Sequence, residues 1–331
     1  MIRKLGLTAS CMVLLSATGL LQGCKQHAQK NGLIPVKLQT DWYPQPEHGG
    51  FYTALAKGYY KDVGLDVQIV PGGPYITAEQ QVSVGAAQFG MSSSDRMLKA
   101  AAGGQSLVAI AATMEHDPQA VMVHAESPVH TFADLNGHAI AIRPGSTWFE
   151  YIVSRYNLKD VREKPATFSV ANFLQDPEYV QQIFVTSEPF YVKKAGQPIR
   201  NLLISDTGYD PYRVFFTSHS YAQEHPEVVA KFVQASLRGW HDYLQDPQVA
   251  HAMIQKLNPA MDPELMQFSY EALRSGHFID GATTGPNGSV DQLGQFEAQR
   301  WVAMEQLLLS LKVIPAPIDP TSVYTTQFLS K

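Results

Sequence analysis

Apolar and polar positions alternate along this chain in a way that predicts repeated strand and helix units. Between Phe51 and Tyr59 the apolar residues have the i, i+3, i+4, i+7, i+8 spacing of a helix that lies on a sheet. The alternation between Leu65 and Ile69 is typical of a strand. The segment 41–73 is therefore expected to hold a strand end, a loop, a helix and a second strand. In open α/β sheets small molecules bind at such strand ends.

The same pattern continues to residue 125, breaks, and starts again. Strands are expected at 36–40, 65–70, 89–91, 107–113 and 121–123, and after a polar break at 124–130 further strands are expected at 139–143, 167–170 and 182–185, with helices at 148–156 and from Pro189. A second turn-rich break at 206–211 precedes a strand at 212–217, and beyond His225 the apolar spacing is helical.

These breaks predict an α/β protein with two lobes, each a mostly parallel sheet flanked by helices. The first lobe is expected to hold residues 33–125, the second lobe residues 126–211, and residues 212–331 return to the first lobe and end in helices. Because the chain crosses twice between the lobes, the ligand cleft is expected between them.

The N-terminus has the pattern of a lipoprotein signal. Basic residues precede an apolar run that is too short for a confident membrane span, and Leu21-Gln22-Gly23-Cys24 fits a lipobox. We therefore expect a signal peptide over 1–24, a lipid on Cys24, and a polar tether over 25–32. An uncleaved anchor helix and a plain signal peptide are the alternatives.

Composition excludes several classes of function. The two cysteines are Cys11 and Cys24, so the body that follows Cys24 has no cysteine for a disulfide, a thiolate metal site or a nucleophile. The formal net charge of −5 argues against nucleic acid as a partner, because binding phosphates needs a basic surface. Histidine spacings typical of metal sites and glycine-rich nucleotide loops are absent from the sequence. Neither a metal, a cofactor nor a catalytic residue is predicted.

Candidate ligand contacts in the first lobe follow two predicted strands. Asp41, Trp42 and Tyr43 come directly after the first strand, where an aromatic pair beside a carboxylate can hold a flat heterocycle. His48 lies where the next helix begins. Alternatively, Trp42 packs in a core and Asp41 caps the helix. After the strand 89–91, the hydroxyls of Ser92, Ser93 and Ser94 exceed what a helix cap needs, so at least one of them is expected to face ligand.

The second lobe offers an equivalent turn and a carboxylate. Gly145, Ser146, Thr147 and Trp148 combine a flexible backbone, hydroxyls, a ring and a helix N-terminus, although capping alone would explain Thr147. Glu188 follows a strand and can accept paired hydrogen bonds from an amidine-like edge, or it can cap the next helix.

The charges of these loops favour a particular class of ligand. Asp41, Asp95 and Glu188 lie in the candidate loops, whereas Arg96 and Arg143 are the nearest cations. This balance favours a neutral or weakly basic, nitrogen-rich ring over a sulfonate.

The chain resembles a family of extracytoplasmic solute-binding proteins that includes thiamine-pyrimidine binders, alkanesulfonate binders and fungal thiamine-pyrimidine synthases. The resemblance is carried by DWYPQPEHGGFY at 41–52, AKGYYKDVGLDVQIVPGG at 56–73, QFGMSSSD at 88–95, FADLNGHAIAIRPGSTW at 132–148 and VTSEPF at 185–190. It covers about residues 33–330 and is closest to the pyrimidine branch. It implies the fold of a type II periplasmic binding protein.

The resemblance also implies a function. It points to a monomeric, membrane-anchored component of an ABC importer that delivers a thiamine pyrimidine precursor to a permease. In the fungal synthases the histidine that matches His48 is consumed as a source of pyrimidine atoms, and a cysteine-rich motif holds iron. Because no cysteine follows Cys24, the synthase reaction is not expected, and the chain is predicted not to be an enzyme. A synthase-like enzyme, or a binder of an alkanesulfonate, a flavin or another aromatic solute, are the alternatives.

Overall fold

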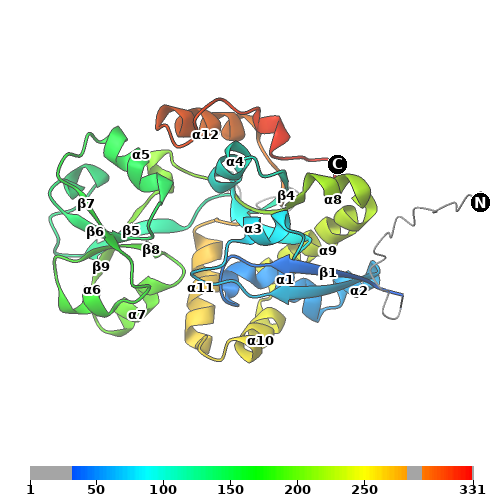
Figure 1. The fold of residues 1–331 in the computed structure, drawn as a ribbon. Helices are drawn as coiled ribbons and strands as arrows, with labels where there is room; N and C mark the ends of the chain where they lie inside the picture. The colour runs from blue at the N-terminus through cyan, green and yellow to red at the C-terminus, as the bar shows by residue number, and fades with distance from the viewer. Residues whose placement is uncertain (1–31, 282–292, 330–331) are drawn as a thin grey trace, which may run out of the picture.

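The computed structural model describes residues 32–281 and 293–329. It contains two five-stranded sheets in separate lobes (Figure 1). The first lobe holds the sheet β2-β1-β3-β10-β4, made of β1 (Ile34–Gln39), β2 (Leu65–Val70), β3 (Phe89–Ser93), β4 (Leu107–Met114) and β10 (Arg213–Ser218). The second lobe holds the sheet β7-β6-β8-β5-β9, made of β5 (Gln119–His124), β6 (Ala139–Ile142), β7 (Arg162–Pro165), β8 (Val180–Phe184) and β9 (Ile199–Leu203).

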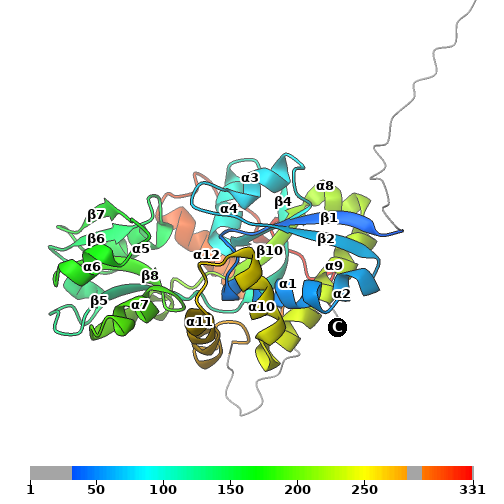
Figure 2. The ribbon, with the colours of Figure 1, turned by 90° about the horizontal axis from the view of Figure 1, so that it is seen from below.

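Each sheet mixes parallel and antiparallel pairs. β1 is parallel to β2 and β3, and β6 is parallel to β7 and β8. The two strands that carry the chain between lobes, β5 and β10, are each antiparallel to both neighbours. The two-lobed α/β fold expected from the sequence is confirmed, and the second lobe lies beside the first in both views (Figures 1 and 2).

The expected boundary at residue 125 was wrong by one strand. β5 pairs with β8 and β9, so it belongs to the second lobe, and the first crossing lies between Met114 and Gln119. The polar break at 124–130 is a surface connection within the second lobe. A strand pairs with whichever edge is available in space, and its own hydrophobic pattern does not identify that edge.

Helices cover both faces of the first sheet and connect the strands of both lobes. They are α1 (Gly49–Ala56), α2 (Tyr59–Asp62), α3 (Ala78–Ser83), α4 (Ser94–Ala102), α5 (Thr147–Arg155), α6 (Ala171–Gln175), α7 (Glu188–Lys194), α8 (His219–Glu224), α9 (Pro226–Gln245), α10 (Gln248–Leu257), α11 (Pro263–Ser275) and α12 (Ala298–Ser310). Short 3₁₀ turns include η1 (Pro46–His48), η2 (Phe132–Leu135), η3 (Ser205–Thr207) and η5 (Pro320–Ser322). No helix among these described residues is both long and apolar enough to span a membrane.

The long helix α9 organises the core of the first lobe. Its apolar stripe, predicted from the sequence, buries Val229, Phe232, Val233 and Trp240 completely or almost so. Phe232 stacks on Phe89 of β3 with ring centroids 3.8 Å apart, so the helix is held directly on the sheet. A second apolar cluster runs from α12 and β10 into the second lobe at Ile140 and Trp148. This cluster includes residues of both lobes.

The predicted strand at 167–170 was also wrong. The strand at this position of the chain is β7, which ends at Pro165, and residues 166–170 form an irregular loop in which Phe168 has a φ of +54°. Left-handed backbone is unusual for a bulky residue. The loop turns the Phe168 ring into the cleft.

Candidate functional site

A cavity of about 570 Å³ lies between the lobes. The loop after β1, the start of α4, and β10 line it from the first lobe. The turn after β6, the loop after β7, and the β8–α7 connection line it from the second. Its volume is within the roughly 300–1,000 Å³ of typical small-molecule sites. Of the predicted contact residues, those that line the cavity are Asp41, Trp42, His48, Ser93, Gly145, Ser146, Thr147, Trp148 and Glu188.

Asp41 is held by two partners at the carboxyl end of β1. His48 donates from Nε2 to Asp41 Oδ1 at 3.0 Å, and Arg213 donates from Nη2 to Asp41 Oδ2. Burial raises the pKa of the Asp41 carboxyl, but the Arg213 guanidinium and the His48 hydrogen bond outweigh it and hold the pKa well below its usual range. Asp41 is therefore an ionised carboxylate whose oxygens are both occupied. His48, which is completely buried, positions Asp41.

The aromatic pair at the cavity differs from the predicted one. Tyr43 is half exposed and lies outside the cavity, with its ring edge against Trp42 at a centroid distance of 5.6 Å. The partner of Trp42 inside the cavity is Phe168 of the second lobe, with ring centroids 5.3 Å apart and planes inclined by 48°. The expected pairing of Trp42 with Tyr43 around a ligand does not fit this geometry, because the Tyr43 ring packs against Trp42 and does not line the cavity. Two rings from opposite lobes face the cavity instead.

Only one residue of the serine cluster reaches the cavity. Ser93 lines it, and its hydroxyl donates to Asp95 Oδ1 at 2.5 Å. Ser92 is buried and donates to Glu79, while Ser94 is buried and accepts a hydrogen bond from the Tyr212 backbone N–H. Ser92 and Ser94 therefore do not line the cavity, since their hydroxyls bond to α3 and to the start of β10, and Ser93 is the serine that stays a predicted ligand contact.

The equivalent turn of the second lobe contributes the Trp148 ring and the N-terminus of α5, which has no side-chain cap. Trp148 is buried, and its indole N–H has no hydrogen-bond partner among the described residues. The hydroxyl of Ser146 donates to the Arg143 backbone carbonyl at 2.6 Å and does not cap α5. Thr147 is the first residue of α5 and accepts from Lys99 Nζ at 3.2 Å, so the capping that was the alternative explanation for Thr147 is not formed. Gly145 has a φ of +75°, which the tight turn requires.

Two further carboxyl groups lie close together at the cavity wall. Glu188 Oε2 accepts from the Phe184 backbone N–H at 3.0 Å, and burial raises the pKa of Glu188 to about 7. Burial likewise raises the pKa of Glu47, which accepts a hydrogen bond from Thr186. Loss of solvent is the main cause of both shifts, and the charge of Glu47 adds least to the shift of Glu188. Glu188 therefore changes protonation state near neutral pH.

Four cations line the cavity, which changes the charge balance expected from sequence. Arg213 and Lys99 join Arg96 and Arg143. Arg213 was missed because it lies on β10, beyond the second crossing and 172 residues from Asp41. In the sequence, Arg213 stands out only as a charged residue at the start of an apolar strand. Phe168 was missed because its loop was interpreted as a strand. The described residues contain no group of three or more His, Cys, Asp or Glu that could hold a metal ion.

Comparisons with known proteins agree with this architecture. A family model described as NMT1/THI5 like matches residues 45–250. The riboflavin-binding protein RibY of Chloroflexus aurantiacus is 24% identical over 307 residues, which cover 90% of this chain and 86% of that protein. The formylaminopyrimidine-binding protein of Halalkalibacterium halodurans is 24% identical over 302 residues, which cover 87% of this chain and 89% of that protein. The structure of the periplasmic aliphatic sulphonate binding protein SsuA from Escherichia coli superposes with a TM-score of 0.66 at 16% identity, covering 90% of this chain and 94% of that one. The chain therefore belongs to the NMT1/THI5-like family and has the two-lobed fold of periplasmic binding proteins.

Proposed function

We propose that this protein is the extracytoplasmic binding component of an ABC importer and captures a small, flat nitrogen heterocycle, with a thiamine pyrimidine precursor as the first candidate. The observation that supports this best is the pair of Trp42 and Phe168, which come from opposite lobes and face one cavity. A flat ring that contacts both aromatic side chains would join the lobes. Stacking contributes roughly 0.5–1.5 kcal/mol beyond burial of area.

The polar groups around the cavity suit a heterocycle with several nitrogen atoms. Both carboxylate oxygens of Asp41 already accept hydrogen bonds, from His48 and Arg213. Glu188 accepts one from the Phe184 backbone, so its carboxyl group can accept further hydrogen bonds from an amidine-like edge of a ligand. Gln181 and Gln182 of β8 add amides that both donate and accept. The names of the relatives support the same class, because one binds riboflavin and another formylaminopyrimidine.

A larger flavin-like ligand is the second candidate. A cavity of about 570 Å³ has room for more than one pyrimidine ring. Trp148 adds a second indole to the lining of the cavity.

A ligand panel tests the proposal. Purified protein is melted with 4-amino-5-aminomethyl-2-methylpyrimidine, its formyl derivative, riboflavin and taurine. At one hundred times the dissociation constant, a true ligand raises the free energy of unfolding by about 2.7 kcal/mol. Small-angle scattering on the same samples is expected to show a smaller radius of gyration, because the lobes close on ligand.

A melting shift with taurine but with neither a pyrimidine nor a flavin would overturn the choice of ligand class. The competing enzyme function is tested in the same samples. Mass spectrometry of the recovered ligand is expected to find it unchanged, and any converted pyrimidine would favour the synthase alternative.

We also propose that a lipid on Cys24 anchors the protein on the outer face of a membrane. Cys24 lies outside the described residues, so the support comes from the lipobox Leu21-Gln22-Gly23-Cys24 alone. An anchored binding protein stays close to its permease, which raises the local concentration of loaded protein.

A further inference from the structure

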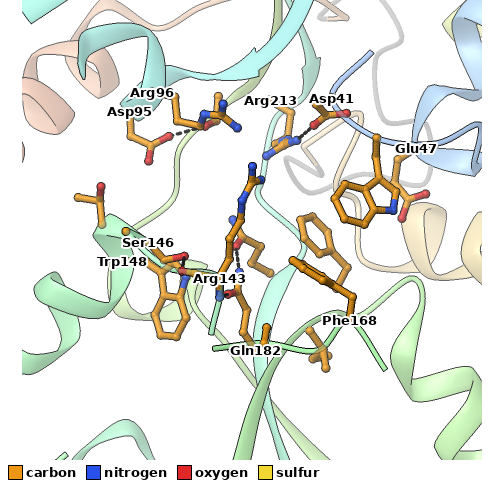
Figure 3. A pocket seen from close by; sticks show the side chains of 18 of the residues that line it. Asp41, Glu47, Asp95, Arg96, Arg143, Ser146, Trp148, Phe168, Gln182 and Arg213 are labelled. Atoms are coloured by element: carbon orange, nitrogen blue, oxygen red, sulfur yellow. Dashed lines mark hydrogen bonds and ion pairs between the residues drawn. The ribbon is translucent and has the colours of Figure 1, made fainter. Parts of the chain in front are cut away.

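Three arginines direct their guanidinium groups toward the same part of the cavity (Figure 3). Arg96 comes from α4 and Arg213 from β10, both in the first lobe. Arg143 comes from the turn after β6 in the second lobe. The cavity therefore has guanidinium groups on both of its sides, and we call these residues the arginine cluster.

The two arginines of the first lobe are neutralised by their own carboxylates. Arg96 donates from Nη2 to Glu79 Oε2 at 2.9 Å, and Arg213 donates to Asp41. Both carboxylates sit on first-lobe elements, so these ion pairs persist whatever the second lobe does. Each pair contributes little net charge to the cavity.

Arg143 is different, because its guanidinium has no hydrogen bond or ion pair with any residue in the described ranges. Only its backbone forms hydrogen bonds: the N–H donates to Gln182 Oε1 at 2.9 Å, and the carbonyl accepts from the Ser146 hydroxyl at 2.6 Å. The side chain is partly buried, and burial first and then the charge of Arg96 lower its pKa. A guanidinium that has lost part of its water without gaining a partner is costly to the folded protein.

Nearby acidic groups do not supply the missing partner. The carboxyl oxygens of Asp95 accept from Ser93 at 2.5 Å and from Tyr209 at 2.6 Å. Asp41 and Glu79, whose charges act on Arg143, are already paired with Arg213 and Arg96. The guanidinium of Arg143 is thus left without a counter-ion from the described parts of the chain.

A second cation extends this positive region toward α5. Lys99 reaches across from α4 to the Thr147 hydroxyl, and it forms no ion pair with the described residues. The first turn of α5 has no side-chain cap, so its backbone N–H groups add a partial positive charge at the same edge of the cavity.

We propose that the ligand carries an anionic group, of the carboxylate or phosphate type, that binds the Arg143 guanidinium between the lobes. This rests on the proposed function, since the anion would be a substituent of the bound heterocycle. A guanidinium binds such groups through two parallel hydrogen bonds. The anion would supply the counter-charge that Arg143 of the second lobe lacks, beside arginines of the first lobe, which favours closure of the cleft.

Matched ligand pairs test the proposal by calorimetric titration. One pair is 4-amino-5-hydroxymethyl-2-methylpyrimidine and its monophosphate, a second is riboflavin and its 5′-phosphate, and a third is uracil and orotate, which adds a carboxylate. The wild-type protein is expected to bind the anionic member of at least one pair at least about tenfold more tightly. Which pair shows this separates a phosphate from a carboxylate.

Substitutions of Arg143 assign the preference to this residue. Arg143→Gln is expected to lose the preference for the anion, and Arg143→Lys to keep part of it, because an ammonium keeps the charge without the paired geometry. Arg155→Gln, which removes an exposed arginine of α5 outside the cavity, is the matched control and is expected to keep it. Without ligand, Arg143→Gln is expected to melt no lower than the wild type, since it removes an unpaired charge.

The outcomes separate this inference from the proposed function. Equal affinity for neutral and anionic members, or a preference that survives in Arg143→Gln, would refute the anion site while leaving the heterocycle binder intact. If no heterocycle binds but inorganic phosphate or acetate does so in a manner that depends on Arg143, the anion site stands and the heterocycle function fails. Binding of none of these probes rejects both.

Discussion

Three acidic side chains at the cavity have different surroundings and therefore different charges. Asp41 accepts from Arg213 and His48, which keep it ionised. Neither Glu47 nor Glu188 forms an ion pair with another residue that the structure describes, and burial raises the pKa of each. At residue scale these three groups thus comprise one ionised carboxylate and two carboxyl groups that burial makes easier to protonate, while Glu79 and Asp95 also line the cavity.

Glu188→Gln is predicted to change how stability depends on pH. The pKa of Glu188 is raised from 4.5 to about 7 in the folded protein, so between these values the folded state binds more protons than the unfolded state. The free energy of unfolding therefore falls as the pH rises through this window, and the neutral amide removes that loss. We expect thermal melts from about pH 5 to pH 8 to show this effect. Over that range the free energy of unfolding of the variant should rise by at least about 1 kcal/mol relative to that of the wild type.

Glu150→Gln, the same substitution at an exposed position of α5, is the control. If the difference in melting temperature between Glu188→Gln and the wild type stays constant across this pH range, the raised pKa of Glu188 is contradicted. Calorimetry on the same variant tests its role toward an aminopyrimidine, for which we expect tenfold weaker binding or more.

Trp42→Ala and Phe168→Ala are each predicted to weaken binding of a flat ligand. Each removes one of the two rings that face the cavity, at a cost of about 1 kcal/mol or more in binding, roughly fivefold. Tyr43→Ala serves as a neighbouring control, because Tyr43 lies outside the cavity. A larger loss in Tyr43→Ala than in Phe168→Ala would contradict the aromatic pair seen in the structure.

At the scale of elements, the first site loop is positioned by close contact between α1 and α9. Gly50 of α1 lies against the Trp240 ring, and Gly239 of α9 faces the Gly50 carbonyl. The two glycines at the start of α1 therefore serve helix packing. Close packing here holds α1, and with it the loop that carries Asp41, Trp42 and His48.

Gly239→Ala is predicted to destabilise the protein. A Cβ at this position would lie 2.2 Å from the Gly50 carbonyl oxygen and 2.7 Å from the Ala54 Cβ, so the helices must separate. Overpacking of this kind costs about 1–3 kcal/mol, which circular-dichroism melts would detect. Gly103→Ala is the control, since its new Cβ would be no closer than 3.4 Å to a neighbour. Equal melting temperatures for the two variants would show that the helices can separate without cost.

At the scale of the whole molecule, contacts at the junction tie the lobes together below the cleft. Thr186 of the second lobe donates to Glu47, and its backbone carbonyl accepts from Ser269 of α11 at 2.5 Å. Lys194 of α7 pairs with Glu264 of α11 at 2.7 Å. These polar contacts and the Trp42–Phe168 contact hold the two lobes against each other in this structure.

Cys24→Ala is predicted to abolish lipid attachment and lipoprotein processing. The lipid would be attached to the sulfur atom of the cysteine side chain, and alanine has no sulfur. Intact-mass measurement and membrane fractionation are expected to show a precursor without lipid, while the ligand-induced melting shift of the purified body stays the same. A membrane-bound variant with the mass of the processed wild type would show that the lipobox interpretation is wrong.

The sequence alone determined the features that depend on neighbouring residues along the chain. Apolar periodicity predicted most strands and helices, and the motifs between residues 41 and 148 identified the family. The turns after β1, β3 and β6 were correctly identified as cavity-lining segments, because small molecules bind at strand ends in this type of fold.

Tertiary structure decided which side chains from these segments meet. Arg213 reaches Asp41 only because β10 returns to the first sheet beside β3, and Phe168 reaches Trp42 only because a loop of the second lobe crosses the cleft. The pairing of β5 with the second sheet and the isolation of Arg143 likewise depend on partners distant in sequence. Periodicity reports which face of an element is buried, but it carries no information on which other element covers that face.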